Sequence, residues 1–361
     1  MEKDLLKKIC IDPDTSIRNS ILVLNDTAKQ ILLVVDKDSR LLGTLTDGDI
    51  RRSMINNVSM NETVTNIMEK KPTTIFPDDM DKAESLMIKL KFHALPVIDQ
   101  DRKVLDLVLW SDSKEIHEQL RTYELKKNKV FVLAGGKGSR LRPLTNILPK
   151  PLVPLGTVPI VEVIMKRFQH FGFNNFILSI NYKGEMIKTY FNDNDEGFHI
   201  EYVQEDNYCG TAGSLSLIKK KIKDTIMVTN CDVIIDVNLD DYFSYHKKNN
   251  NDATIVGVIR HIKIPYGVME VEKSELTTFK EKPDFDYIVN AGMYIIEPKV
   301  VHLIDDGKYL DMPDLLMNAK KSGMKVGVYP VASDMIDIGH WSDYELALAK
   351  AKKIGFISEV Q

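Results

Sequence analysis

A glycine-rich segment, residues 133–156, carries several residues that could bind phosphate. It reads LAGGKGSRLRPLTNILPKPLVPLG and directly follows an apolar stretch at 129–133 that predicts a buried strand. Glycines let the backbone approach a phosphate chain and turn its N–H groups toward the anion. Arg140 adds a guanidinium suited to phosphate oxygens, and Lys150 adds a compact positive charge. The segment therefore predicts a phosphate-binding loop rather than an ordinary turn between a strand and a helix.

Two aspartates could hold a divalent cation beside such a loop. Asp232 follows a predicted buried strand at 226–229, and Asp337 stands just before a predicted helix at 341–353. A carboxylate at the end of a buried strand can hold Mg²⁺ against a triphosphate, although such a residue also serves as a turn former or a helix cap. Cys231 lies next to Asp232, and we expect it to be a small strand-end residue rather than a nucleophile.

The glycine-rich segment resembles the L-x-GGxGTRL-x-PLT…PKPL-x-P-x-G motif of sugar-nucleotide pyrophosphorylases, the nucleotidyltransferases that join a sugar 1-phosphate to an NTP. Ser139 stands where that family usually has Thr, and this change keeps the hydroxyl. The resemblance implies a bound Mg²⁺, or Mn²⁺ in its place. The implied catalytic residues are Arg140, Lys150 and Lys282, and the implied metal ligands are Asp232 and Asp337.

Shorter motifs follow in the order and spacing of that family, so the resemblance covers residues 129–361. It implies that the sugar phosphate is held by an EKP motif, in which Glu takes a sugar hydroxyl and Lys the phosphate. The implied nucleotide-binding residues are Leu133, Ala134, Gly135, Gly136, Lys137, Gly138, Ser139, Gln204, Glu205 and Gly210. The implied sugar-phosphate-binding residues are Tyr266, Gly267, Glu281, Lys282, Asn290 and Gly292.

The implied reaction is an in-line attack by a sugar-1-phosphate oxygen on the α-phosphorus of an NTP, which expels pyrophosphate. Such chemistry asks the protein mainly for positioning and charge neutralisation. Arg140 is expected near the departing pyrophosphate, Lys150 near the α-phosphate and Lys282 near the nucleophile.

The residues alone leave the base open. Guanine presents two donors and suits a carboxylate, whereas uracil and thymine present one donor beside a carbonyl and suit an amide. Gln204 and Glu205 are adjacent, so the sequence supplies both an amide and a carboxylate that could recognise the base. GTP, UTP and dTTP are therefore not separated by this argument.

The first third of the chain repeats itself with an offset of 63 residues, so that GTLTDGD at 43–49 matches DLVLWSD at 106–112. The first copy resembles the strand-to-helix motif of CBS domains, whose tandem pairs often bind adenine nucleotides. The implied ligand residues are Thr46 and Asp49. The second copy keeps Asp112 but has Leu109 in place of the hydroxyl residue, so at most one pocket is intact. The alternative is a structural or dimerising pair in which Asp49 caps a helix.

These features predict an α/β chain with three parts. Residues 1–122 form a tandem CBS α+β pair (about 1–60 and 63–122), 123–128 form a linker, and 129–361 form a Rossmann-like, GT-A-like nucleotidyltransferase domain. Strands alternating with helices predict a mostly parallel sheet covered on both faces. We expect its strands near 129–133, 176–180, 226–229, 253–259, 288–296 and 326–330. We expect its helices near 159–171, 184–191, 213–221, 239–248 and 341–353.

Tandem CBS domains ahead of such a transferase resemble the glucosamine-1-phosphate guanylyltransferases of bacterial legionaminic acid synthesis, which accompany flagellar glycosylation. The resemblance implies GTP and glucosamine 1-phosphate as substrates and GDP-glucosamine as product. Two alternatives stay open: a uridylyl-, thymidylyl- or mannose-specific relative, and a nucleotide-sensing regulatory subunit with an inert transferase domain.

Composition and charge indicate where in the cell the protein works and which kinds of partner it lacks. The chain has 361 residues and a net charge of −4, which gives no reason to expect a nucleic-acid partner. Its apolar runs are too short to span a bilayer, and its three cysteines fit reduced thiols in the cytoplasm. We therefore expect a cytoplasmic protein without a membrane partner. Because CBS pairs commonly associate, we also expect a homo-oligomer, a dimer or higher.

Overall fold

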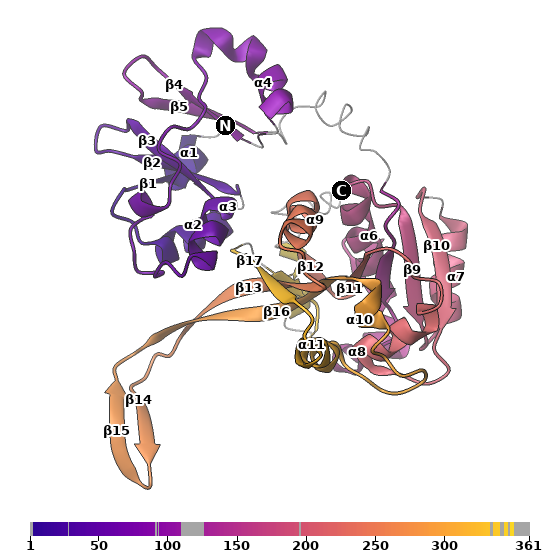
Figure 1. The fold of residues 1–361 in the computed structure, drawn as a ribbon. Helices are drawn as coiled ribbons and strands as arrows, with labels where there is room; N and C mark the ends of the chain where they lie inside the picture. Colours follow the sequence, from indigo (N-terminus) through magenta and orange to yellow (C-terminus); the bar gives the residue numbers. More distant parts are fainter. Residues whose placement is uncertain are drawn as a thin grey trace.

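The computed structural model describes residues 3–109 and 126–349, apart from 28, 91, 93, 195, 333, 334, 340–342 and 346. Figure 1 shows an N-terminal body beside a larger C-terminal body, and a two-stranded ribbon that projects from the latter. None of the described helices is long and apolar enough to cross a membrane.

The N-terminal body contains two small sheets. One has β1 (Cys10–Ile11), β2 (Ile31–Val35) and β3 (Leu41–Thr46), and the other has β4 (Ala94–Ile98) and β5 (Val104–Leu109). Its helices are α1 (Lys3–Ile9), α2 (Ile17–Thr27), α3 (Asp47–Ile55) and α4 (Ala83–Leu90). The predicted ligand-motif residue Asp112 lies outside the described residues, and so do residues 123–125 of the predicted linker.

The 63-residue repeat is visible in the turns of these sheets. Asp36 Oδ1 accepts hydrogen bonds from the N–H groups two and four residues later, at 2.9 and 2.8 Å, and Asp99 Oδ1 does the same at the same distances. Ser39 and Arg102 both turn left-handed, with φ of 62° and 63°. The two copies share one apolar core, to which the first contributes Leu33 and the second Leu107 among others. The two copies therefore pack on each other.

A seven-stranded sheet forms the centre of the C-terminal body. Its order is β10 (His199–Gln204), β9 (Asn175–Ile180), β6 (Val130–Leu133), β11 (Ile226–Asn230), β16 (Asp284–Ile296), β13 (Ala253–Lys263) and β17 (Val326–Val331). Within it β16 runs antiparallel to β11 and β13, and the other pairs are parallel. The predicted mostly parallel sheet is confirmed. The carboxyl ends of β6, β11, β13 and β17 consequently share one edge.

Helices and apolar cores cover both faces of this sheet. The side chains of β6 alternate, so that Val130 and Val132 face one core and Phe131 the other. The main helices are α6 (Ile160–His170), α7 (Gly184–Asp193), α9 (Leu239–Lys248), α10 (Pro298–Val301) and α11 (Met312–Lys321). The helix predicted at 213–221 is instead a short α8 (Gly210–Gly213) that continues as a 3₁₀ turn (Ser214–Ile218). Glycines at both ends of α8 weaken a longer helix.

Two antiparallel ladders extend the sheet beyond the body. β13 and β16 remain paired as far as Lys263 and Asp284, and β14 (Val268–Glu272) pairs with β15 (Glu275–Lys280) beyond them. Residues 260–287, which we call the arm, make up the ribbon that projects at the lower left of Figure 1. Sequence analysis predicted the inner halves of β13 and β16 but not this extension.

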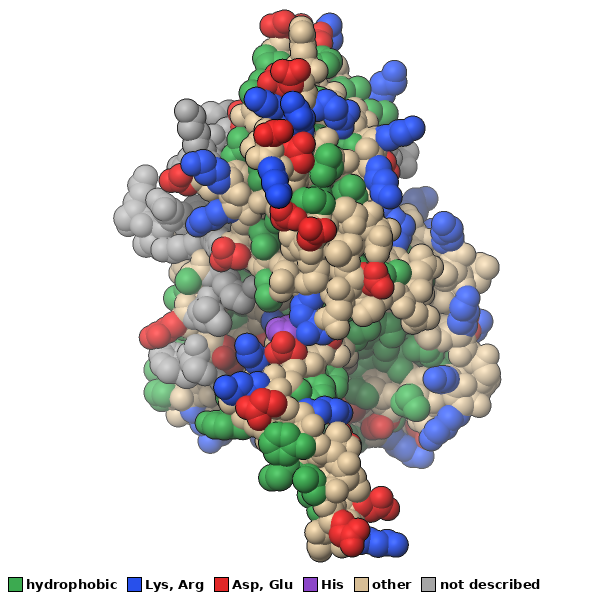
Figure 2. All heavy atoms as spheres, turned by 90° about the vertical axis from the view of Figure 1, so that its left-hand side faces the viewer, with side chains coloured by type: hydrophobic (Ala, Val, Ile, Leu, Met, Phe, Trp, Pro, Cys, Tyr) green, Lys and Arg blue, Asp and Glu red, His purple; other side chains and the backbone are tan. Residues whose placement is uncertain are grey.

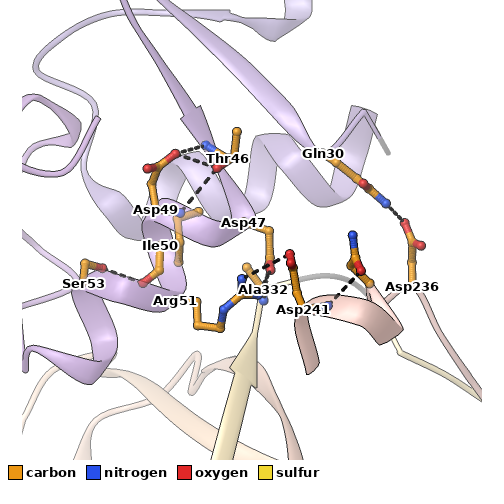
Figure 3. A network of polar contacts seen from close by, with 11 residues as sticks. Gln30, Thr46, Asp47, Asp49, Ile50, Arg51, Ser53, Asp236, Asp241 and Ala332 are labelled. Carbon is orange, nitrogen blue, oxygen red and sulfur yellow. Dashed lines mark hydrogen bonds and ion pairs between the residues drawn. The ribbon is translucent and has the colours of Figure 1, made fainter. Parts of the chain in front are cut away.

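The first CBS repeat is docked on the edge strand β17 through α3 (Figure 3). Asp47 Oδ1 accepts a 2.7 Å hydrogen bond from the N–H group of Ala332, directly after β17. The Arg51 guanidinium pairs with Asp47 at 3.0 Å and lies 4.3 Å from the centre of the Tyr329 ring. The two bodies are thus joined by directional contacts at a defined position.

Candidate active site

The glycine-rich loop leaves β6 at Leu133 and closes over Lys150. Gly138 adopts φ of 60°, and a Cβ atom there would lie 2.8 Å from Lys150 Cβ. Thr145 Oγ1 donates a 2.9 Å hydrogen bond to the carbonyl of Gly138 and fixes this approach. Lys137, Ser139 and the cation of Arg140 are exposed, on the outer side of the loop. The loop therefore brings the predicted phosphate-binding residues and Lys150 together.

The two predicted metal ligands come together on a short ladder. β12 (Val233–Ile235) pairs antiparallel with β18 (Met335–Asp337), with Val233 opposite Asp337. The carbonyl of Asp232 accepts a 2.9 Å hydrogen bond from the N–H of Ile338, and its carboxylate lies 2.5 Å from Lys150 Nζ. Partial desolvation and the charge of Asp232 raise the pKa of the Asp337 carboxyl, while Lys150 and Arg140 oppose that shift.

This pair fits a hard divalent cation. Mg²⁺ is usually bound through one or two carboxylates together with waters and substrate phosphates, not by a full protein cage. Within the described residues no group of three or more His, Cys, Asp or Glu side chains could hold a metal. Two carboxylates that the ladder of β12 with β18 brings together beside a phosphate loop are the donor set that such a cation needs.

The structure treats Gln204 and Glu205 differently. Gln204 ends β10 and is exposed beside the start of α7, whereas Glu205 is only 3% exposed. Ser179 Oγ donates to Glu205 Oε1 at 2.5 Å, and the N–H of Cys209 donates to Oε2 at 3.2 Å. A Cβ atom at Gly135 would lie 2.8 Å from Glu205 Oε1, so the carboxylate lies directly against the glycine loop. Glu205 therefore lies against the glycine loop, whereas Gln204 is exposed beside α7.

The region after Glu205 is held by a second glycine. Gly210 has φ of 79°, and a Cβ atom there would meet the carbonyl oxygen of Leu310 at 2.5 Å. The N–H group of the following residue, Thr211, donates a 3.0 Å hydrogen bond to Asp311 Oδ1. These contacts position the chain between Glu205 and α8.

The sugar-phosphate candidates divide into two groups. Gly292, with φ of 68°, lies against Asn230 at the end of β11, and Asn290 Oδ1 accepts a 3.0 Å hydrogen bond from the N–H of Gly292. This pair therefore lies at the same sheet edge as Asp232. The other group, Tyr266, Gly267, Glu281 and Lys282, lies on the arm.

Three further residues contribute without having been predicted. Ser179 and Thr145 fix Glu205 and the glycine loop as described, and Asn181 Nδ2 donates a 2.7 Å hydrogen bond to the carbonyl of Glu205. Ser179 is a polar residue at an inward position of an otherwise apolar strand, and that pattern could have singled it out. Burial and the neighbouring Asp232 raise the pKa of the Cys231 thiol to about 12, so the prediction that it is no nucleophile agrees with its environment.

The CBS candidates Thr46 and Asp49 form a capping box at the start of α3. Asp49 Oδ2 accepts from the Thr46 N–H at 2.8 Å and from the Thr46 hydroxyl at 2.6 Å, and Asp49 also pairs with Arg52. Both carboxylate oxygens are thus engaged in holding the helix. This is the geometry of the structural alternative, while a ligand role for the pair stays a prediction.

Comparisons with known proteins agree with this architecture. Residues 129–353 match the family model described as Nucleotidyl transferase, and residues 1–56 and 64–112 match that of the CBS domain. The chain is 34% identical over 224 residues to a probable glucose-1-phosphate cytidylyltransferase of Bacillus subtilis, which covers 56% of this chain and 87% of that protein. It is 38% identical over 187 residues to a mannose-1-phosphate guanyltransferase of Yarrowia lipolytica, covering 49% of this chain and 51% of that one.

The chain therefore spans most of the cytidylyltransferase but only about half of the guanyltransferase. Among solved structures, one from Bacillus anthracis that is provisionally assigned as a glucose-1-phosphate thymidylyltransferase superposes with a TM-score of 0.52 at 21% identity. It covers 64% of this chain and 97% of that one, and it supports the fold of the C-terminal body.

Proposed function

The chain belongs to the nucleotidyl transferase family, and from this premise we propose that it joins GTP to glucosamine 1-phosphate, with release of pyrophosphate. The broader activity, that of a sugar-1-phosphate nucleotidyltransferase, is supported by the family match and by relatives that act on several sugar phosphates. The guanylyl choice and the sugar are the parts that we propose.

The observation that carries the choice of GTP is the buried carboxylate of Glu205 beside the glycine loop. An ionised carboxylate has about four acceptor sites, and Ser179 and Cys209 occupy two of them. The N1–H and N2–H donors of guanine match the two that are left. An amide at this position would offer a single acceptor oxygen and would suit uracil or thymine instead.

The reaction requires correct positioning and neutralised charge rather than a protein nucleophile. An oxygen of the sugar phosphate forms a bond to the α-phosphorus while the bond from that phosphorus to the bridging oxygen breaks, and pyrophosphate leaves with the electron pair. Lys150, buried under the loop, is the cation nearest to Asp232, and Arg140 supplies a guanidinium on the outer side. Asp232 and Asp337 would hold Mg²⁺, which supplies charge neutralisation for the transferred phosphoryl group when bound.

Support for glucosamine 1-phosphate is the combination of CBS repeats with this transferase, which resembles the enzymes that supply GDP-glucosamine to legionaminic acid synthesis in the cytoplasm. A mannose-1-phosphate guanylyltransferase or a uridylyl- or thymidylyltransferase would use the same mechanism. A regulatory subunit with an inert transferase domain is the third alternative. The preserved set of Lys150, Asp232 and Asp337 opposes it, because an inert domain has no need to keep two adjacent carboxylates beside a buried cation.

The test is pyrophosphate release with Mg²⁺ across a grid of four NTPs and several sugar 1-phosphates, repeated with AMP and ATP present. Turnover confined to GTP and glucosamine 1-phosphate would support the full proposal. Turnover with UTP or dTTP would refute the role given to Glu205, and turnover with mannose 1-phosphate would refute the sugar. No turnover on any pair would favour the regulatory alternative.

For the CBS pair we propose at most one adenine-nucleotide site, at Thr46 and Asp49. The alternative is a purely structural role, which the capping box of these two residues supports. Calorimetry with AMP and ATP separates the two. Saturable binding that Asp49→Ala abolishes, with the fold retained, would establish the site. Absence of binding in the unaltered protein would leave the structural role.

A further inference from the structure

The outer part of the arm has one apolar face, and that face is exposed. Met269 pairs with Phe279 across the ribbon and Val271 pairs with Leu276, so all four side chains point to the same side. Their exposed fractions are 61%, 56%, 61% and 59% in that order. The opposite face is polar and includes the 3.0 Å ion pair of Glu270 with Lys280. Figure 2 shows apolar side chains gathered on the projecting ribbon.

A ribbon of this kind needs a surface to pack on. An isolated two-stranded hairpin is marginally stable in water, and a contiguous apolar patch on an otherwise charged protein marks an interaction site. The arm projects away from both bodies of its own chain in Figure 1. Its apolar face therefore lacks a covering element among the described residues.

The root of the arm fixes its direction. Arg18 of α2 in the first CBS repeat contacts Asp286 at 2.5 Å and Asp284 at 3.9 Å. His261 on the facing strand lies 2.9 Å from Asp286 and 3.6 Å from Asp284. Because the ladder of β13 and β16 is continuous through this point, the contacts of Arg18 fix the direction in which the arm leaves the sheet.

Charged residues stand where the two ladders of the arm meet. Glu281 and Lys282 are exposed, Lys282 has φ of 42°, and Tyr266 next to them is 75% exposed. At the sheet edge, by contrast, Lys150 is already paired with Asp232 at 2.5 Å, so a sugar phosphate that attacks there calls for a further cation. A dianionic nucleophile that approaches a triphosphate needs such a cation.

We propose that the arm completes the active site of a second copy of this chain. In this arrangement Lys282 reaches the sugar phosphate and Glu281 a polar group of the sugar in the partner's site, while the apolar face packs on the partner's body. The arm leaves the sheet at the carboxyl ends of β13 and β17, the same edge that carries Asp232 and Asp337. A two-fold axis near that edge places each arm over the other chain's site, and the exchange closes as a dimer.

This inference rests on the proposed function, and a complementation experiment tests it. Asp232→Asn inactivates the site in the body, and Lys282→Ala inactivates the arm. Each homodimer should lose about 100-fold or more of the wild-type turnover. A heterodimer with one variant in each chain, isolated through two affinity tags after co-expression, has one site with both parts intact. It should recover about half of the wild-type turnover, as one of two symmetric sites does.

Two results of that experiment would overturn the inference. A heterodimer as inactive as the two homodimers means that each arm serves its own chain. Wild-type turnover in the Lys282→Ala homodimer means that the arm reaches no sugar phosphate.

A second measurement keeps the inference testable if the chain shows no turnover at all. Sedimentation should give a dimer for the wild type and a monomer for the double variant Met269→Glu, Phe279→Glu, with unchanged circular dichroism. The control Thr278→Glu places one such charge on the polar face and should stay dimeric. A wild type that is monomeric at micromolar concentration, or a double variant that remains dimeric, would refute the arm exchange whatever the substrates are.

Discussion

The substitution Glu205→Gln tests how this chain selects its nucleotide. The side chain keeps its size, so the contact with Gly135 is preserved, but the carboxylate becomes an amide. The amide has one acceptor oxygen, and because Ser179 and Cys209 donate to different oxygens of Glu205, one of them faces that oxygen in either orientation. At most one guanine donor can then be satisfied, and the charge that strengthened the contact is gone.

The size of the effect follows from those bonds. A hydrogen bond to a charged group contributes about 1.5–3 kcal/mol. Loss of one bond and weakening of the other predicts about 3 kcal/mol, or about a hundredfold lower kcat/KM with GTP. The same amide pairs with the N3–H and a carbonyl of uracil or thymine, so kcat/KM with UTP or dTTP should stay the same or rise.

The assay compares kcat/KM for GTP, UTP and dTTP at fixed sugar phosphate, with the melting temperature as a check on folding. Gln204→Glu is the matched control, because it places a carboxylate one residue away on an exposed side chain and should change kcat/KM with GTP less than about twofold. An equal loss with all three nucleotides would refute the reasoning and leave Glu205 a structural residue. So would full activity with GTP in a folded Glu205→Gln protein.

Three other substitutions test parts of the structure. Asp49→Ala removes the capping box of α3 and should lower the free energy of unfolding by about 0.5–2 kcal/mol in denaturant titrations, and an unchanged value would contradict the cap. Gly292→Ala should destabilise the protein more than Gly307→Ala: both glycines have positive φ, but a Cβ at Gly292 would lie 2.5 Å from a neighbouring atom and one at Gly307 would meet open space. Cys231→Ala should keep turnover within about threefold of wild type. In the native protein at pH 8, mass spectrometry after iodoacetamide treatment should find Cys10 alkylated before Cys231, since Cys231 is buried and its pKa is near 12.

The elements that carry the phosphate loop and Asp232 could be predicted because their signals are local. The apolar run at 130–133 leads through Ala134 into two glycines, and the apolar run at 226–228 leads into Thr229 and Asn230. Such short runs before glycines or polar residues are typical of buried parallel strands. The ladder of β12 with β18 could not be predicted in this way. Each of its strands has only three residues, which is too short to show the alternation of apolar and polar residues that marks a strand. Only the folded chain brings Asp337 opposite Val233.

Which of Gln204 and Glu205 faces the glycine loop could be decided only from the structure, because it depends on where β10 ends. Successive side chains of a strand point to opposite faces, so two adjacent residues cannot both enter the site. β10 is an edge strand with mixed and partly exposed side chains, and its alternation is too weak to locate it from the sequence. Its hydrogen-bonded register with β9, from His199 to Gln204, decides the question.

The arm escaped prediction for a different reason. Its motif residues, Glu281 and Lys282, have the order and spacing of a sugar-phosphate site, and spacing along the chain carries no information on which copy of the chain they serve. The length of β13 and β16 beyond the body is set by cross-strand pairing with exposed partners, which a burial pattern does not report.

The position of Asp232 and Asp337, the proposed metal ligands, depends on more than the transferase sheet. Asp47 of the first CBS repeat accepts the N–H of Ala332, five residues before Asp337, and Gln30 of the same repeat donates to Asp236, four residues after Asp232. Both contacts, which Figure 3 shows, are made close to the ladder: Asp236 directly follows β12, and Ala332 lies three residues before β18. Because that ladder has only three residues in each strand, the CBS repeat contributes directly to the geometry of the site, beside any ligand that it binds.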